Sequence, residues 1–177
     1  MSELRTNRIV PRDGLPAGSA GGIIQVKSTT MTNNVSYSIS GMTWTEVTPL
    51  SLAITPTRSD SKILCMLTMG GMASSNDGQR YGVALRRNST NIAINTDSGS
   101  YTQASWAYTG RGLGNALEGH PAFNHLDSPA TTSSVTYRVM ITTEGSYTLY
   151  VNRSQSDSSS SSVFRTASSF TLMEISG

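Results

Sequence analysis

Charged residues are scarce in this sequence. Asp, Glu, Lys and Arg make up 14% of the 177 residues, whereas about 25% is usual for a globular domain. The formal net charge is only +2, which is too small to supply the basic stripe of a nucleic-acid-binding surface. We therefore expect no nucleic-acid partner.

Cysteine and histidine are nearly absent. The single cysteine, Cys65, excludes an intrachain disulfide, and its apolar neighbours in "KILCMLTM" predict a buried side chain. A structural zinc site needs three or four soft ligands at close spacing, but the only histidines are His120 and His125. No loop places carboxylates at alternate positions as a calcium loop does. We expect no metal site.

Long apolar runs are also missing. No stretch of 18 apolar residues exists, so we expect no membrane insertion. The segment "MSELRTNRIVPRDG" lacks the apolar stretch of a secretion signal, which indicates a chain made and folded in a cytoplasm. The glycines of "GRGLG" (110–114) are not followed by Gly-Lys-Ser/Thr and have no βαβ context. We expect no cofactor.

Hydroxyl residues and short alternating apolar runs dominate what is present. Ser and Thr make up 51 of the 177 residues, yet β-branched and aromatic residues recur too regularly for a disordered chain. In 134–143 the side chains of Tyr137, Val139 and Ile141 share one face, as the two-residue period of a strand requires. No window sustains a helical period. Eight to ten short strands predict an all-β fold, a β-sandwich, and most simply a jelly roll.

Several local patterns give specific expectations. Residues 36–47 predict two short strands broken at Gly41, and "NDG" (76–78) predicts a tight hairpin turn. "EGS" (144–146) predicts a turn that makes 135–151 a hairpin. The strand "KILCMLTM" is apolar on both faces, which predicts a place in the centre of a sandwich or under a subunit contact.

The segment "HLDSP" is the most obvious candidate for a catalytic site. His125, Asp127 and Ser128 lie within four residues, but the members of a Ser-His-Asp triad normally come from separated parts of a chain. No G-x-S-x-G motif is present. The competing interpretation is a turn fixed by Pro129, with Asp127 and Ser128 bonded to local backbone. We expect no catalytic residues and a protein that is not an enzyme, although a small esterase or glycan hydrolase using His125 and Asp127 remains an alternative.

Aromatic residues gather in the least regular region, 96–121. Tyr101, Trp106 and Tyr108 lie within eight residues, and aromatic rings on loops are a common means of binding sugars or proteins. These three are candidate receptor contacts, together with the serine run 158–162. The alternative is that their rings fill a core edge or pack between subunits.

Residues 1–21 have few apolar side chains and cannot build a core. They carry three arginines and two prolines, with Leu4, Ile9 and Val10 as the apolar anchors. We expect a short extended N-terminal arm that docks on a partner through Leu4, Arg5, Ile9 and Val10, followed by a single domain at 22–177.

The segments "GGIIQVKSTT", "WTEVTPLSLAITPTRSDSKILCMLTMGG" and "LDSPATTSSVTYRVMITTEGSYTLYVNRS" resemble small virion and tail-fibre proteins of tailed bacteriophages, particularly those of cyanobacteria. The resemblance extends through "LRTNRIVPRDGLPAG" to the virion-facing leader of such proteins. It implies a jelly-roll head like that of tumour necrosis factor, assembled as a homotrimer. No coiled-coil or collagen repeat precedes the head, so a short fibre or tip fits better than a full fibre.

The resemblance also implies the partners and the location. The arm would anchor the protein in the virion, on tail, collar or capsid proteins, after assembly in the host cytoplasm. Tyr137, Tyr147 and Tyr150 would be buried between three subunits, and the loops would contact a host cell-surface glycan or protein. The alternative function is a capsid or tail decoration protein that stabilises the particle without binding a receptor.

Overall fold

The computed structural model describes residues 22–76, 78–109 and 117–177. These residues form an all-β structure with antiparallel strand pairs and no helix. The predicted all-β class is therefore confirmed. The strands are β1 (Ile23–Met31), β2 (Val35–Ile39), β3 (Thr45–Ile54), β4 (Lys62–Thr68), β5 (Met72–Ser74), β6 (Tyr81–Arg87), β7 (Thr90–Ile92), β8 (Trp106–Tyr108), β9 (Ala122–Asp127), β10 (Val135–Thr143), β11 (Tyr147–Val151) and β12 (Ser168–Ile175).

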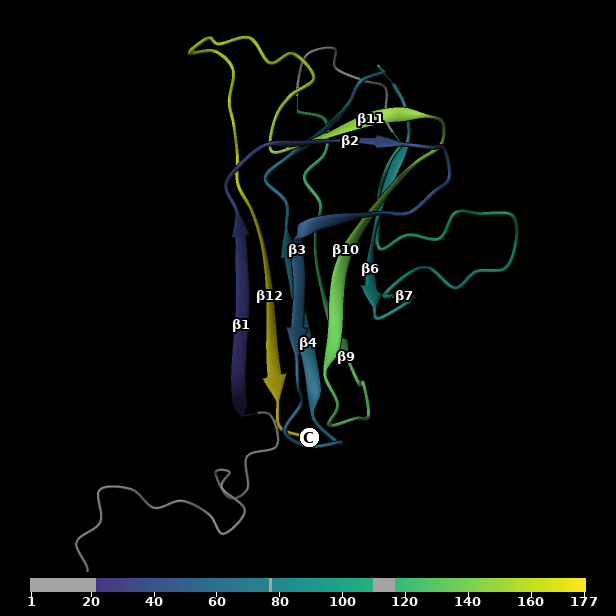
Figure 1. Cartoon of the computed structure of the whole chain (residues 1–177). Coiled ribbons are helices and arrows are strands. Elements are labelled where there is room, and N and C mark those ends of the chain that lie inside the picture. The colour runs from purple at the N-terminus through teal and green to yellow at the C-terminus, as the bar shows by residue number, and fades with distance from the viewer. Residues whose placement is uncertain (1–21, 77, 110–116) are drawn as a thin grey trace, which may run out of the picture.

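Two larger sheets build the sandwich. The first has the order β1-β12-β4-β9, and the second has the order β3-β10-β6-β7 with β8 paired to β6. Their inner faces contribute to one buried cluster, in which Cys65 and Phe170 from the first sheet join Tyr137, Val139 and Ile141 from the second. The long strands run side by side along the molecule in Figure 1. The predicted inward face of 134–143 and the burial of Cys65 are thus confirmed.

A third, smaller sheet lies at one end of the sandwich. It has the order β2-β11-β5, and β2 and β11 cross the direction of the long strands at the top of Figure 1. The predicted hairpin of 135–151 is therefore wrong, because β11 pairs with β2 and β5 rather than with β10. The predicted hairpin at "NDG" is also wrong. Gly78 has the expected positive φ of 78°, but β5 and β6 belong to different sheets.

The second of the two short strands predicted in 36–47 is longer than expected. It was predicted to end at residue 47, but β3 continues without a break to Ile54. β3 pairs with β10 on both sides of an irregularity, with Ser51 opposite Arg138 and Glu46 opposite Met140. Pro49 lies in this irregular part of β3. Proline lacks the N–H that a regular ladder needs and is tolerated at such interruptions. The bulge therefore lets a single strand continue past Pro49.

The outer face of the first sheet is apolar near one end. The register places Val26, Met173, Leu64 and Leu126 in one row across all four strands. Val26 is 51% exposed and Leu126 is 47% exposed. β4 is thus not covered on both sides within one chain, so of the two settings predicted for "KILCMLTM" only the subunit contact remains as a proposal. We call these four residues the apolar row.

Some expectations fall on residues outside the described ranges. These include the whole arm 1–21, with the anchor candidates Leu4, Arg5, Ile9 and Val10, and the glycines of 110–114. Within the described ranges, no helix has the length and hydropathy needed to cross a membrane.

Candidate functional site

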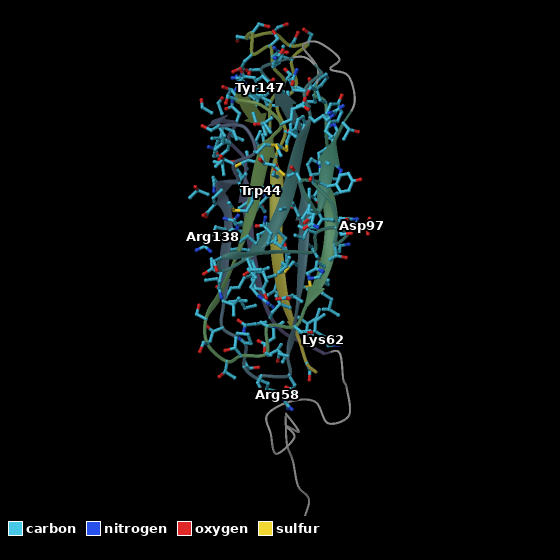
Figure 2. The ribbon with its side chains drawn as sticks, turned by 90° about the vertical axis from the view of Figure 1, so that its right-hand side faces the viewer. Trp44, Arg58, Lys62, Asp97, Arg138 and Tyr147 are labelled. Carbon is cyan, nitrogen blue, oxygen red and sulfur yellow. The ribbon has the colours of Figure 1, made fainter. Side chains whose placement is uncertain are left out.

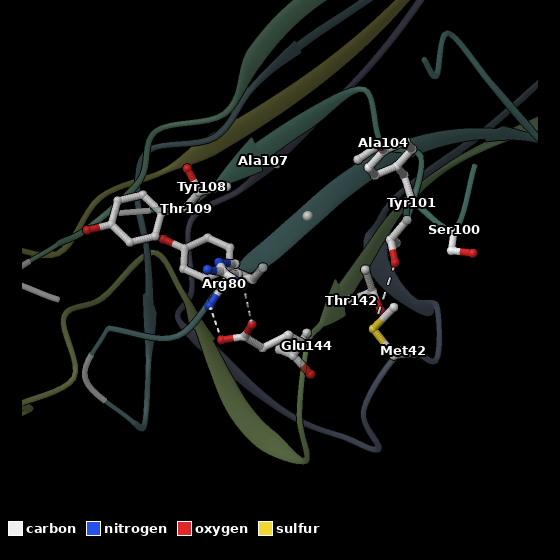
Figure 3. A pocket seen from close by; sticks show the side chains of 14 residues that line it. Met42, Arg80, Ser100, Tyr101, Ala104, Ala107, Tyr108, Thr109, Thr142 and Glu144 are labelled. Carbon is white, nitrogen blue, oxygen red and sulfur yellow. Dashed lines mark hydrogen bonds and ion pairs between the residues drawn. The ribbon is translucent and has the colours of Figure 1, made fainter. Parts of the chain in front are cut away.

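A pocket of about 410 Å³ opens on the outer face of the second sheet. It lies over β6, β8 and β10, beside the loop that joins β7 to β8 and the turn that joins β2 to β3. Figure 3 shows this site from close by. The residues that line it are Met42, Arg80, Tyr81, Gly82, Ser100, Tyr101, Thr102, Ala104, Ala107, Tyr108, Thr109, Thr142, Thr143 and Glu144.

Small residues form the sheet surface beneath the pocket. Gly82 on β6 pairs with Ala107 on β8 and with Thr142 on β10. A Cβ atom at Gly82 would lie 3.3 Å from the Cβ of Ala104, which is closer than ordinary contact. The absence of a side chain at Gly82 therefore lets the β7–β8 loop pack closely over β6 and leaves space in front of the sheet.

Thr142 supplies a buried hydroxyl at this surface. Its position on β10 directs it away from the core that Ile141 fills, and only 3% of Thr142 is exposed. The Oγ1 atom of Thr142 has no hydrogen-bond partner among the described residues. A buried polar atom without a partner is costly, so most such atoms are paired in native proteins. An unpaired hydroxyl that lines a pocket is therefore a candidate ligand contact.

Tyr101 and Met42 border the pocket at the end formed by the loops. The Tyr101 residue is 74% exposed, and Met42 is 56% exposed. The Met42 backbone N–H donates to the Thr143 carbonyl at 2.7 Å, and the Thr102 hydroxyl lies 3.8 Å from the Met42 sulfur. These contacts fasten the β2–β3 turn and the β7–β8 loop to the same end of β10 (Figure 3).

An ion pair closes the opposite end. Arg80 Nη1 lies 3.3 Å from Glu144 Oε2, and the Arg80 backbone N–H donates to Glu144 Oε1 at 3.1 Å. The Glu144 N–H in turn donates to the Arg80 carbonyl at 3.1 Å. Among the described residues, Arg80 and Glu144 are the only charged ones that line the pocket. The site therefore offers hydrogen-bonding groups with little net charge.

The aromatic candidates divide between the pocket and the core edge. Tyr101 lines the pocket, and Trp106 is half-buried and packs against the core. Tyr108 does both, because it borders the pocket and its half-buried side chain packs against the core. The Tyr81 ring stacks on Tyr108 with centroids 5.1 Å apart and lies 6.1 Å from the Trp106 ring. Burial raises the pKa of the Tyr81 hydroxyl, with a further increase from Glu118. The structure thus places Trp106 at the core edge, Tyr101 at the surface pocket and Tyr108 between the two.

Sequence reasoning missed Arg80, Thr142 and Glu144. Arg80 precedes one strand and Glu144 follows another, 64 positions away. The sequence indicates only the orientation of Thr142, because the alternation of apolar residues along β10 places this residue on the outer face. What brings the three together is the pairing of β6 with β10, which single-sequence periodicity does not reveal.

The segment that contains His125 and Asp127 does not form a relay. Asp127 accepts a hydrogen bond from the Tyr137 hydroxyl at 2.6 Å and two from Arg87 Nη1 at 2.9 Å. The expectation that Asp127 bonds to local backbone is therefore wrong, since Asp127 bonds to side chains from β6 and β10. Ser128 contributes its carbonyl, which lies 3.4 Å from Arg87 Nη1.

The three tyrosines proposed for a subunit interface lie in different settings. Tyr137 is fully buried in the core of one chain, so its assignment to a subunit interface is wrong. Its burial and its hydrogen bond to Asp127 both raise the pKa of its hydroxyl. Tyr147 and Tyr150 are half-buried on β11, and the Arg153 guanidinium lies 4.1 Å from the centroid of the Tyr150 ring. Figure 2 shows Tyr147 near the end of the molecule opposite Arg58 and Lys62.

Comparisons with protein families and with curated proteins identify no relative. No protein-family model matches the chain, and no curated protein is significantly similar to it. Within residues 22–76, 78–109 and 117–177, no three His, Cys, Asp or Glu side chains gather as a metal site requires.

Proposed function

We propose that this chain is a virion protein of a tailed bacteriophage, whose head is a trimeric jelly roll with a recognition pocket on its surface. The observation that carries the proposal is the placement of two surfaces. The apolar row lies on the outer face of the first sheet, and the pocket lies on the outer face of the second. Copies that associate through the first sheet leave the pocket exposed to solvent.

The strand order supports the jelly roll. Each larger sheet pairs strands distant in sequence, with β12 between β1 and β4, and β10 between β3 and β6. The chain therefore crosses repeatedly from one sheet to the other. This alternation is what two interlocked Greek keys produce in a jelly roll. The head of tumour necrosis factor has the same general architecture.

The apolar row supports assembly as a homotrimer. Four apolar side chains from four strands form one surface, and Met66 at 37% exposed extends it. Contiguous apolar patches on soluble proteins commonly mark protein contacts. Burying them against other copies would remove the apolar area from water at about 25 cal/mol per Å². This surface replaces the tyrosine interface in the proposal.

The location follows from the resemblance. The arm 1–21 would anchor the head to tail, collar or capsid proteins of the virion, with Leu4, Arg5, Ile9 and Val10 as contacts. Deleting 1–21 should leave a folded trimer that fails to incorporate into particles. Normal incorporation of the truncated protein would contradict the anchor.

The first experiment measures the mass of the full-length protein by sedimentation velocity. The wild type should sediment as a trimer. Leu126→Lys should shift it to monomers, because the ammonium group would have to be desolvated at the interface. Thr30→Lys is the matched control, since Thr30 lies on the same face in a row of hydroxyl and small residues. A monomeric wild type, or equal effects of both substitutions, would contradict the interface.

The second experiment separates recognition from decoration. Fluorescently labelled full-length protein should attach to marine cyanobacterial cells, and Tyr101→Ala should reduce attachment. Phe164→Ala is the control, because Phe164 is also 74% exposed but does not line the pocket. A trimer that incorporates into particles but attaches to no cells would favour the decoration protein over the receptor-binding one.

A further inference from the structure

We propose that the pocket binds a single uncharged sugar ring, the terminal residue of a surface glycan. This inference deepens the proposed function, on whose recognition site it rests. It follows from three features of the described residues: aromatic side chains that line the pocket, the unpaired Thr142 hydroxyl and the paired charges of Arg80 and Glu144.

The aromatic lining suits the C–H face of a pyranose. Tyr101 extends from the β7–β8 loop and is 74% exposed. A ligand that covers its ring would therefore remove apolar surface from water, which favours binding. Tyr108 also borders the pocket, and its half-buried ring stacks on the Tyr81 ring at 5.1 Å and packs against the core. Rings with few rotatable bonds present a large apolar contact area at low entropic cost. The lining therefore favours a flat ligand that has an apolar face.

The Thr142 hydroxyl favours a ligand that also carries hydroxyl groups. Thr142 Oγ1 lacks a partner among the described residues, and a hydroxyl can both donate and accept. A purely apolar ligand would leave this buried atom without a hydrogen-bond partner, which is unfavourable. A sugar hydroxyl can satisfy Thr142 while the carbon face of the same ring contacts tyrosine. One ligand class thus meets both requirements.

The charges favour an uncharged sugar over an acidic or a basic one. Arg80 and Glu144 are the two charged residues among the described ones that line the pocket, and they pair with each other at 3.3 Å. A carboxylated or phosphorylated sugar would compete with Glu144 for Arg80, and it would have to be desolvated near that carboxylate. An amine would meet the opposite problem at Arg80. Neutral hydroxyl groups can bond to either partner without breaking the pair.

The size of the pocket sets the scale of the ligand. Its volume of about 410 Å³ lies in the lower part of the range of about 300–1,000 Å³ found for small-molecule sites. One ring with its substituents fits this range better than a folded peptide segment. A single ring implies weak binding per site, which three copies in a trimer would strengthen through avidity.

The test is a ligand-observed NMR titration of the full-length protein with neutral methyl glycosides. The panel contains the common hexoses, a deoxyhexose and the N-acetylhexosamines, with methyl glucuronide as the charged counterpart. At least one neutral glycoside should bind, and it should bind more tightly than the glucuronide. Tyr101→Ala should weaken binding about tenfold, and Thr142→Val, which removes only the hydroxyl, about fivefold.

Controls test whether the loss is local. Ala107→Leu adds bulk at an exposed position of the pocket and should abolish binding without disturbing the core. Phe164→Ala and Thr136→Val should keep the wild-type affinity, since Thr136 lies on the same strand and face as Thr142 but outside the pocket. Urea unfolding should give similar midpoints for Tyr101→Ala and wild type, which would show that lost binding is not lost folding.

The outcomes separate the sugar assignment from the proposed function. If the labelled protein attaches to cells through Tyr101 but no neutral glycoside binds, recognition stands and the sugar assignment is overturned. If a glycoside binds in the pocket but the protein attaches to no cells, the sugar assignment stands and host recognition fails. Binding that is unaffected by both Tyr101→Ala and Ala107→Leu would place the ligand elsewhere and overturn the inference.

Discussion

The Tyr137 hydroxyl donates a 2.6 Å hydrogen bond to the carboxylate of Asp127 inside the sandwich. Tyr137 belongs to the second sheet and Asp127 ends a strand of the first, so this bond joins the two sheets directly. Arg87 Nη1 lies 2.9 Å from each carboxylate oxygen of the same aspartate. The segment that resembled a catalytic site thus holds a structural connection across the core.

Removing either partner of this connection should destabilise the protein. Tyr137→Phe keeps the ring and loses one hydrogen bond to a charged group, which should lower the free energy of unfolding by about 2 kcal/mol. Asp127→Ala leaves the buried Tyr137 hydroxyl and the partly buried Arg87 side chain without their shared partner. It should lower the free energy of unfolding by about 3 kcal/mol or more. Urea unfolding followed by circular dichroism measures both changes.

Asp60→Ala serves as the control for Asp127→Ala. Asp60 also pairs with an arginine, Arg58, at 2.9 Å, but both side chains are exposed. Solvated pairs contribute little to stability, so the unfolding midpoint should hardly move. Equal losses in Asp60→Ala and Asp127→Ala would contradict the structural role of the buried network.

Glu174 should make the stability depend on acidic pH. It is fully buried and accepts hydrogen bonds from Gln25 Nε2 at 2.5 Å and from both the backbone N–H and the hydroxyl of Thr57 at 2.7 Å. Burial raises the pKa of Glu174, but these hydrogen bonds outweigh it and hold the pKa below the ordinary value of 4.5. The carboxylate therefore stabilises the fold above pH 4.5, and its contribution disappears as the pH falls through the lowered pKa.

The measurement is the free energy of unfolding between pH 7 and pH 3 for wild type and Glu174→Gln. The glutamine variant should be less stable at pH 7 by about 1–3 kcal/mol, because its amide presents donors where Gln25 and Thr57 donate. Its stability should fall less steeply below pH 4.5 than that of the wild type. Glu46→Gln, which alters a partly exposed pair with Arg138, should keep the steep decline. Parallel curves for wild type and Glu174→Gln would refute this role.

Periodicity predicted most strands because each buries one face in the shared core. The alternation of Tyr137, Val139 and Ile141 is visible in the sequence and holds in the structure. Which strands pair was not predictable in the same way. "EGS" and "NDG" have the composition of hairpin turns, yet each links strands of different sheets. The pairing of a strand depends on which distant strand hydrogen-bonds to its free edge. Local residue propensity does not contain that information.

The candidate site shows the same division. Tyr101 and Tyr108 were identifiable as aromatic residues in an irregular region. The positions of Arg80 and Glu144 depend on the register of β6 against β10, in which Tyr81 pairs with Thr143. A shift of this register by one residue would move Thr142 and Gly82 off the pocket surface. The site therefore required the three-dimensional pairing, although its residues are ordinary in sequence.

Asn152 should be among the least replaceable residues of the described chain. It is fully buried with a φ of 64°, a left-handed conformation that asparagine tolerates better than most residues. Its Nδ2 donates to the Met31 carbonyl at 2.9 Å and to the Asn33 carbonyl at 3.0 Å, and its Oδ1 accepts from the Ser168 hydroxyl at 2.6 Å. One side chain thus connects the end of β1 to the start of β12.

Asn152→Asp should therefore be severely destabilising although it changes the side-chain volume very little. The new carboxylate would face two carbonyl oxygens that have lost their donor, so either an unpaired charge is buried or a proton is taken up. The expected cost is about 3 kcal/mol or more at pH 7, and it should shrink on acidification as the carboxyl becomes protonated. Asn33→Asp introduces the same charge at an exposed position and should leave the urea midpoint nearly unchanged. A small, pH-independent loss in Asn152→Asp would mean that the two carbonyls find other donors.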